Sequence, residues 1–369
     1  MNEIIRCTRC ILPSSFPGIH FNDEGVCNVC EEYDQQWGSW SEKNWSSNRK
    51  KLDRILKHVR KLNRPYDCLV PFSGGKDSTY VLYLCTKVFK LKVLAVNVSN
   101  GFQTAEALDN IRKAVEALEV DLITYKPSLK LYRELARAFL FTTGEGCTPC
   151  NIGVVLTINR IAEQERIPLI FSGVSRKSDE RSPKEIYMSG GEYFLKVIRK
   201  NGLNKRIKGS VYQDQERQLG LPFRIKRKLA RLVLMDKGVF KYLPKKLAVR
   251  NSVMLQMPDF IEWNEDLIFK TIREELGWEE SDVGKEHTDC RINPVKGYLR
   301  YHRWGFGAKT QKLAALVRDG QMDRESALMD VKQEDEVPEK SLEYFKRELN
   351  LNDQEMEQIY ATTHEEFIN

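Results

Sequence analysis

Long apolar stretches are missing from this 369-residue sequence. No run reaches the roughly 18 apolar residues that a transmembrane helix requires. The N-terminal stretch MNEIIRCTRC also lacks the apolar core of a signal peptide. Internal repeats and low-complexity tracts are absent as well, which argues against solenoids and fibrous arrays. We therefore expect a cytoplasmic protein with no membrane span.

Charge is plentiful but unevenly distributed. Charged residues make up 30% of the chain and hydrophobic residues 41%, which is typical of a soluble globular protein with one large α/β domain plus appendages, or with two domains. The net charge of +7 conceals a basic segment, residues 196–250, where 17 Lys and Arg oppose 3 Asp and Glu. This segment is expected to meet an anion, a membrane surface or an acidic partner, or to be only a solvated helical face.

Nine cysteines are present, and in a cytoplasmic protein they are expected to be metal ligands or catalytic groups and not disulfides. Four of them, Cys7, Cys10, Cys27 and Cys30, form two C-x-x-C pairs separated by 16 residues. This spacing predicts a zinc ribbon with a closed, structural Zn²⁺ site. Four buried free cysteines or a redox pair are the alternatives.

Strands and helices alternate between residues 67 and 185. Apolar runs at 68–72, 92–98, 120–126 and 167–173 predict strands, and the stretches between them predict helices. This alternation predicts an α/β fold with a parallel sheet that binds ligands at the carboxyl ends of its strands. Beyond residue 185 the alternation stops, and mainly helical structure is expected. The predicted domains are a zinc-ribbon module (1–40), an α/β core (41–185), a basic, mainly helical insertion (186–285), and a C-terminal motif with a helical cap (286–369).

The stretch PFSGGKDS, residues 71–78, joins the first predicted strand to a helix. It is not a Walker loop, because its glycines are adjacent and an aspartate separates the lysine from the second serine. The Gly-Gly turn, the helix N-terminus and the serine hydroxyls are nevertheless suited to holding phosphate oxygens. Lys76 can balance phosphate charge, and Asp77 could hold Mg²⁺.

This stretch resembles the SGGxDS loop of the PP-loop ATP pyrophosphatases, a superfamily that includes GMP synthetase, asparagine synthetase and the tRNA thiolation enzymes. The resemblance implies a Rossmann-like fold of the adenine nucleotide alpha hydrolase type. It also implies that ATP is cut between its α and β phosphates, that the loop holds the leaving pyrophosphate, and that Ser73, Lys76 and Asp77 are catalytic.

The residues then expected to bind ATP lie at three strand ends: Pro71, Phe72, Ser73, Gly74, Gly75, Lys76, Asp77 and Ser78 at the first, Asn97, Ser99, Asn100 and Gly101 at the second, and Ser172, Gly173, Arg176 and Lys177 at the third. For the last two of these, an exposed basic turn is the alternative interpretation.

A further group of cysteines consists of Cys147 and Cys150, in GEGCTPCN, and the distant Cys290, in EHTDCRINP. Such a trio resembles that of the tRNA-thiolating branch of the superfamily, where it holds a 4Fe-4S cluster with one iron open. Three thiolates could equally bind a second Zn²⁺ with an open fourth position. Alternatively, the C-x-x-C pair is structural and Cys290 is unrelated to it.

Over the whole chain, the sequence more closely resembles the N-acetyl sugar amidotransferases of bacterial surface-polysaccharide synthesis, including lipopolysaccharide O-antigens. The resemblance rests on four stretches found together: CTRCILPSSFPGIHFNDEGVCNVC, PFSGGKDSTYVLYL, CTPCN and HTDCRINPVKGYLRYHRWGFG. Their joint occurrence is far more specific than any one of them alone.

This resemblance implies an ATP-dependent enzyme that converts an acetamido group of a nucleotide-linked sugar to an acetamidino group and releases AMP and pyrophosphate. Ammonia would come from separate glutaminase and cyclase-like subunits, since no glutaminase domain is evident in the sequence. ATP, Mg²⁺ and Zn²⁺ are the expected cofactors, and nucleic acid is not expected as a partner. The alternatives are a PP-loop tRNA thiolase with a 4Fe-4S cluster and a zinc-ribbon nucleic-acid adaptor, although the intact SGGKDS argues against the adaptor.

Overall fold

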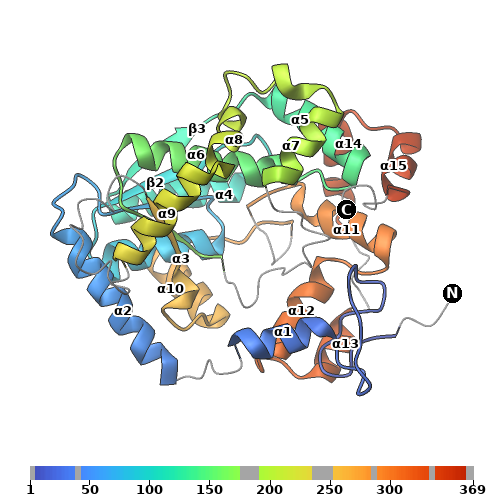
Figure 1. The fold of residues 1–369 in the computed structure, drawn as a ribbon, viewed down its shortest axis with the longest axis horizontal. Coiled ribbons are helices and arrows are strands. Elements are labelled where there is room, and N and C mark those ends of the chain that lie inside the picture. Colours follow the sequence, from blue (N-terminus) through green and yellow to red (C-terminus); the bar gives the residue numbers. More distant parts are fainter. Residues whose placement is uncertain are drawn as a thin grey trace.

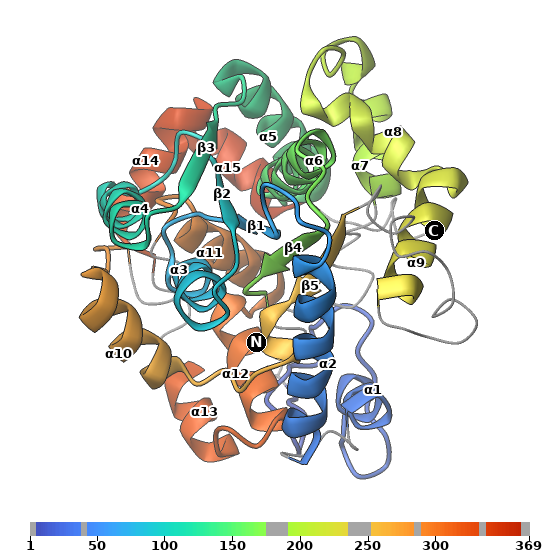
Figure 2. The ribbon, with the colours of Figure 1, turned by 90° about the vertical axis from the view of Figure 1, so that its left-hand side faces the viewer.

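The computed structural model of the chain describes residues 5–37, 43–174, 191–234, 252–283, 289–331 and 337–362. In these ranges, parallel strands form one sheet with helices on both of its faces (Figures 1 and 2). A cysteine-rich module and further helices lie beside this α/β core. None of the helices in the described ranges is both long and apolar enough to cross a membrane.

The sheet consists of β1 (Cys68–Pro71), β2 (Val93–Val98), β3 (Asp121–Tyr125), β4 (Leu169–Ser172) and β5 (Val253–Gln256). The strand order is β3-β2-β1-β4-β5, and every neighbouring pair is parallel. The direction of winding reverses at β1, which lies between β2 and β4. In an open parallel sheet, such a reversal leaves a crevice for ligands at the carboxyl ends of these strands. The α/β fold predicted from the sequence is confirmed.

The fifth strand was not predicted. The sequence pattern indicated that the alternation ends at residue 185, yet β5 pairs with β4 from Val253 to Gln256. It lies inside the stretch 186–285 that was expected to be a mainly helical insertion, so part of that stretch completes the sheet. The strand is short and follows a long basic segment, and its alternating burial is typical of an edge strand.

Successive residues of β1 pack against helices on opposite faces of the sheet. Cys68 and Val70 belong to a cluster with α2 (Lys43–Arg60), α3 (Lys76–Tyr83), α4 (Ala105–Leu118) and α10 (Glu265–Leu276). Leu69 belongs to a cluster with α6 (Thr148–Gln164). Because neighbouring strand residues point to opposite faces, the continuous apolar run of β1 requires cover on both sides. The stretch of residues 71–78, which the sequence predicts to hold phosphate and which is called the phosphate loop below, is therefore held by a strand that is buried on both faces.

The other helices form two groups. The first lies near α5 (Leu129–Thr143) and α6 (Figure 1) and consists of α7 (Gly191–Lys200), α8 (Asp214–Leu219) and α9 (Leu221–Leu234). The C-terminal region is helical, as predicted, and consists of α11 (Asn293–Trp304), α12 (Ala308–Arg318), α13 (Arg324–Val331), α14 (Glu339–Leu349) and α15 (Asp353–Tyr360).

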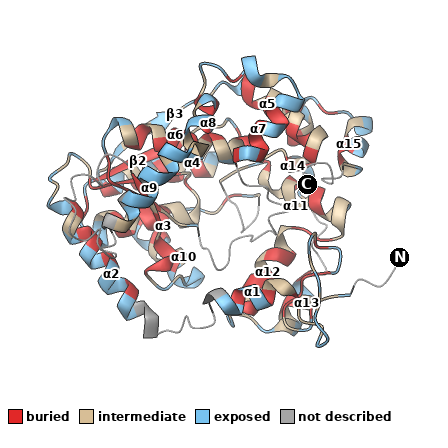
Figure 3. Ribbon diagram, in the orientation of Figure 1, coloured by how far each residue is buried: buried red, intermediate tan, exposed pale blue. Residues whose placement is uncertain are grey.

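The N-terminal module, which includes α1 (Asn28–Trp37), packs against helices α12 and α13 (Figure 1). Figure 3 shows the buried residues that these two helices contribute. The rings of Phe16 and Phe306 lie 5.1 Å apart between their centroids. The Arg324 guanidinium donates hydrogen bonds to the carbonyl oxygens of Cys7 and Cys10. The cysteine-rich module therefore shares a core with the C-terminal helices.

Candidate functional site

The phosphate loop between β1 and α3 depends on Gly74. This residue has φ +84°, and a Cβ at this position would lie 2.2 Å from the carbonyl oxygen of Ala107. Only glycine fits both the backbone conformation and the close approach of α4. The Gly74 carbonyl oxygen accepts hydrogen bonds from Trp278 Nε1 at 2.9 Å and from Asn110 Nδ2 at 3.4 Å. Contacts with α4 and with the segment after α10 therefore hold the turn in one conformation.

The loop's serines form a compact network around the first turn of α3. Ser78 Oγ donates to the Gly75 carbonyl oxygen at 3.0 Å and accepts from the Ser73 backbone N–H at 3.3 Å. The hydroxyls of Ser73 and Ser78 lie 3.2 Å apart. Hydroxyls and helix N-terminal N–H groups gathered in this way are suited to phosphate oxygens.

Lys76 stands between two carboxylates at the start of α3. Its Nζ lies 3.3 Å from Asp77 Oδ2 and 3.2 Å from Glu265 Oε1 of α10. Burial lowers the pKa of Lys76, but the two carboxylates outweigh burial and raise it above its usual value. Asp77 Oδ1 also accepts a hydrogen bond from Trp263 Nε1 at 3.1 Å. The charged groups of Lys76 and Asp77 are thus positioned by α10 and the segment before it. The sequence analysis did not assign either of these elements to the site.

The end of β4 meets the loop, as its place beside β1 requires. A Cβ on Gly173 would lie 2.9 Å from the Cβ of Asp77, so glycine permits this contact. Ser172 Oγ accepts a hydrogen bond from the backbone N–H of Val174 at 3.2 Å. Arg176 and Lys177, predicted to contact phosphates, lie outside the described residues.

The residues at the end of β2 that were predicted to bind ATP have different contacts. Asn97 is buried and donates from Nδ2 to the Phe72 carbonyl oxygen at 2.9 Å, so it links the ends of β1 and β2. Ser99 donates its backbone N–H to the Tyr125 carbonyl oxygen at 2.9 Å. Gly101 has φ +83°. Asn100 donates from Nδ2 to Cys150 Sγ at 3.2 Å.

A segment of the C-terminal motif runs alongside the phosphate loop. Cys290 forms an antiparallel bridge with Gln103, and the Arg291 backbone N–H donates to the Phe102 carbonyl oxygen at 2.8 Å. This segment also brings Asp289 against Gly75, where a Cβ would lie 3.3 Å from Asp289 Cγ. Sequence reasoning missed Asp289, although it directly precedes Cys290 in EHTDCRINP.

Cys147, Cys150 and Cys290 lie close enough to affect one another electrostatically. Burial raises the pKa of Cys147 to about 12, and burial also raises the pKa values of Cys150 and Cys290. In the described part of the chain, however, the three sulfurs do not all lie within 4.8 Å of one another. A metal or cluster at these three cysteines therefore stays a prediction.

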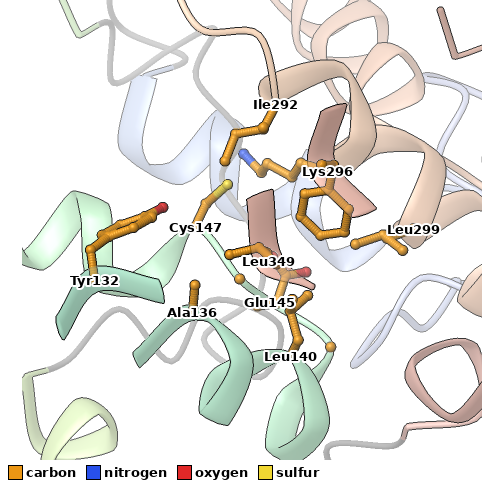
Figure 4. Close-up of a pocket in the computed structure, with 12 residues that line it drawn as sticks. Tyr132, Ala136, Leu140, Glu145, Cys147, Ile292, Lys296, Leu299 and Leu349 are labelled. Atoms are coloured by element: carbon orange, nitrogen blue, oxygen red, sulfur yellow. The ribbon is translucent and has the colours of Figure 1, made fainter. Parts of the chain in front are cut away.

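A narrow pocket opens beside Cys147, between α5, α11 and α14 (Figure 4). Tyr132, Cys147 and Lys296 contribute its polar groups, and leucines from all three helices contribute apolar ones. On one wall, Glu145 forms a buried bidentate ion pair with Arg300, with distances of 3.0 and 3.2 Å. This pair joins the loop before α6 to α11 and so fixes the position of Cys147 relative to the C-terminal helices.

The N-terminal cysteines have the arrangement expected of a tetrahedral metal site. The Sγ atoms of Cys7 and Cys30 lie 3.9 Å apart and those of Cys10 and Cys27 lie 3.7 Å apart, with all four residues buried. Four thiolates at about 2.3 Å from a zinc ion would be about 3.8 Å from one another. Backbone N–H groups of Cys10, Leu12 and Cys27 point at these sulfurs. The four cysteines therefore fit a structural Zn²⁺.

Two stretches of the chain match known protein families. Residues 67–201 match the phosphoadenosine phosphosulfate reductase domain, and residues 277–369 match the C-terminal domain of WbpG-like LPS biosynthesis proteins. The chain therefore combines a region similar to a domain of the PP-loop superfamily with a region similar to the C-terminal domain of WbpG-like proteins. This combination fits the N-acetyl sugar amidotransferase family that the sequence resembles.

Two individual proteins are similar to the chain, both at low sequence identity. The uncharacterized protein MJ1599 of Methanocaldococcus jannaschii is 24% identical over 304 residues, which cover 82% of this chain and 86% of that protein. Among solved structures, the U34-tRNA thiolase NcsA from Methanococcus maripaludis, which holds a [4Fe-4S] cluster, is 16% identical. The match covers 95% of this chain and 100% of the thiolase, with a TM-score of 0.33. A structural similarity with so low a TM-score carries no information about the reaction.

Proposed function

We propose that this protein is an ATP-dependent amidotransferase that converts the acetamido group of a nucleotide-linked sugar to an acetamidino group. The observation that carries the proposal is the contact between its two matched regions. Three residues of the WbpG-like region, Trp278, Asp289 and Arg291, contact the phosphate loop or the adjoining segment of the PP-loop domain. This contact supports the proposal, because it brings a region similar to LPS biosynthesis proteins next to the loop that we propose to bind ATP.

The proposed reaction begins with activation of the acetamido oxygen. An amide carbon is a poor electrophile because its nitrogen donates electrons into it. The amide oxygen attacks the α-phosphorus of ATP, the bond from the α-phosphorus to the bridging oxygen breaks, and pyrophosphate leaves. Ammonia then adds to the activated carbon, the C–O bond breaks, and AMP leaves with that oxygen. The net change replaces the amide oxygen by nitrogen and gives the amidine.

The chain's own groups would act mainly through position and charge. The loop from Ser73 to Ser78 would hold the departing pyrophosphate with N–H groups and hydroxyls. Lys76 would offset the growing phosphate charge, and Glu265 and Asp77 hold its ammonium in place. An oxygen-rich site at the loop suits Mg²⁺, which would neutralise phosphate charge when bound.

Ammonia requires a partner or a high concentration of ammonium, because at neutral pH nearly all of it is protonated. We propose that separate glutaminase and cyclase-like subunits deliver it, as the family resemblance implies. We also propose a cytoplasmic location, where nucleotide-linked sugars and ATP are available.

A second candidate is a PP-loop tRNA thiolase. Cys150 and Cys290 favour it because both contact the loop that follows β2, and Cys147 interacts electrostatically with both of them. Their position does not require sulfur transfer, since thiols can also hold a structural metal. The match of residues 277–369 to LPS biosynthesis proteins favours the sugar acceptor instead.

The test is incubation with ATP, Mg²⁺, ammonium and a panel of nucleotide-linked acetamido sugars, with mass spectrometry and nucleotide analysis of the products. We expect AMP and pyrophosphate to form together with a sugar in which NH replaces O, and only when an acceptor is present. Ser73→Ala should abolish turnover and leave the folded protein intact. Formation of ADP and phosphate, or thiolation of tRNA in place of a sugar product, contradicts the proposal.

A further inference from the structure

Asp289 presents a carboxylate to the phosphate loop that nothing in the described structure neutralises. A Cβ at Gly75 would lie 3.3 Å from Asp289 Cγ and 3.4 Å from Asp289 Oδ2. Within the described residues, no hydrogen bond or ion pair to this carboxylate is found, and the side chain is half-buried. An unpaired carboxylate in this position is unexpected at a loop built to hold anions.

The backbone fixes where this carboxylate lies. The Asp289 carbonyl oxygen accepts a hydrogen bond from the Thr104 backbone N–H at 3.3 Å, and the next residue bridges to Gln103. Gln103 in turn donates from Nε2 to the Ser73 carbonyl oxygen at 3.3 Å. The segment that carries Asp289 is therefore joined to residues 102–104, and Gln103 joins these residues to the loop. The fold thus holds the carboxylate against the loop.

Asp77, the residue expected from the sequence to hold Mg²⁺, already has partners. Its Oδ1 accepts from Trp263 Nε1 at 3.1 Å, and Lys76 Nζ lies 3.3 Å from each of its carboxylate oxygens. Asp289 has no such partners among the described residues. Of these two carboxylates beside the loop, Asp289 is the one with oxygens left to accept a cation.

The charge of the bound nucleotide decides whether the Asp289 carboxylate opposes or favours its binding. Metal-free ATP is strongly anionic, and a carboxylate next to its phosphates repels it. A Mg²⁺ ion bound to the phosphates reverses the sign of the interaction, because Mg²⁺ prefers oxygen ligands and commonly joins a carboxylate to substrate phosphates. The same side chain then favours the complex that carries the metal.

We propose that Asp289 is the positioning residue through which the C-terminal region selects the magnesium complex of ATP over the metal-free nucleotide. The inference rests on the proposed function insofar as ATP is taken to be the ligand of the loop. It adds a role for this one carboxylate, which couples nucleotide binding to metal binding. That coupling is measurable without turnover.

The experiment measures the affinity of the full chain for α,β-methylene-ATP, which cannot be cleaved at the proposed position, by calorimetry in Mg²⁺ and in EDTA. It compares the wild type with Asp289→Asn and with Asp282→Asn, a control that removes an exposed carboxylate seven residues earlier. We expect Asp289→Asn to bind the metal-free analogue about tenfold more tightly and the magnesium complex less tightly than the wild type. Asp282→Asn should behave like the wild type in both buffers.

Folding of each variant is checked by circular dichroism and thermal unfolding. Asp289→Glu keeps the charge and should retain most of the preference for the magnesium complex, which separates the effect of charge from damage to the segment. An unchanged ratio of the two affinities in Asp289→Asn overturns the inference and leaves the proposed function standing. If the wild type does not bind the magnesium complex at all, the proposed function and this inference both fail.

Discussion

The indole N–H of Trp278 donates to the carbonyl oxygen of Gly74 over 2.9 Å, and both residues are buried. They stand 204 positions apart in the chain. Because the peptide group is planar, tying down this carbonyl also sets the direction of the N–H group of the next residue. The first residues after α10 thus determine how the loop presents its donors to a phosphate.

We expect Trp278→Phe to weaken nucleotide binding and to lower the free energy of unfolding by about 1–2 kcal/mol, because a buried carbonyl loses its shortest hydrogen bond. The ring remains, so most of the packing is kept. Urea unfolding and titration with a nucleotide analogue measure the two effects. Val120→Ala removes a partly buried apolar side chain from the same core and leaves the loop's hydrogen bonds intact. If both variants change affinity equally, the hydrogen bond has no special role.

Gly74→Ala should abolish nucleotide binding. The new methyl group would lie 2.2 Å from the Ala107 carbonyl oxygen, and alanine is also disfavoured at φ +84°. Gly320→Ala is a matched control, since Gly320 has φ +74° but nothing lies within 4 Å of its added Cβ. Both substitutions carry the backbone cost of about 1–2 kcal/mol, and only the first carries the clash. Equal binding by both variants would mean that the loop can move away from α4.

The cysteine-rich module should carry one Zn²⁺ per chain. We expect Cys27→Ser to lose this zinc in metal analysis and to unfold at a lower temperature, because the three remaining thiols cannot complete the four-thiolate site. Cys85→Ala changes a buried cysteine far from the module in sequence and should keep its zinc. Zinc content that is unaffected by Cys27→Ser refutes the site.

Glu145→Gln should lower the free energy of unfolding by about 3–5 kcal/mol, because Arg300 would be left fully buried without its carboxylate. Chemical denaturation measures this loss. Glu116→Gln breaks an exposed pair with Arg112 and should lower the free energy of unfolding far less, because solvent screens exposed ion pairs. Similar losses in the two variants would show that the buried pair contributes no more than a surface pair.

The cysteine trio is tested by purifying the protein without oxygen and measuring iron, zinc and visible absorbance. If a cluster binds there, iron should be present in the wild type and absent in Cys290→Ser, while the zinc of the N-terminal module is retained. Burial holds the Cys147 pKa near 12, so metal binding at these thiols must displace protons and should weaken as the pH falls. Equal metal content in the wild type and Cys290→Ser argues for an unoccupied, structural trio.

The core of the fold could be predicted because it is encoded locally. An apolar run followed by Gly-Gly and an amphipathic helix determines β1, the phosphate loop and α3 within about 20 residues. The four N-terminal cysteines were found from spacing alone. β5 escaped prediction because its VMLQ is too short to distinguish from a buried turn and follows a long basic segment.

The partners of the loop could not be predicted in the same way. Trp263, Glu265, Trp278 and Asp289 carry no periodicity or spacing that links them to Lys76 or Gly74. They reach the loop only because α10 packs on α3 and the segment at residue 290 pairs with Gln103. Contacts between residues so far apart in sequence follow from the complete fold, and a single sequence contains no signal for them.

The packing of the N-terminal module on α12 and α13 has a consequence for how the chain is made. Arg324, which binds the carbonyl oxygens of Cys7 and Cys10, follows Cys7 by 317 residues. At about 5–20 residues per second, a ribosome needs roughly a quarter of a minute to a minute to synthesise that interval. Throughout this time Phe16 and its apolar neighbours have no α12 or α13 to cover them. The module must therefore wait for these helices to be synthesised before its apolar side is covered, and early zinc binding would protect it from aggregation in the meantime.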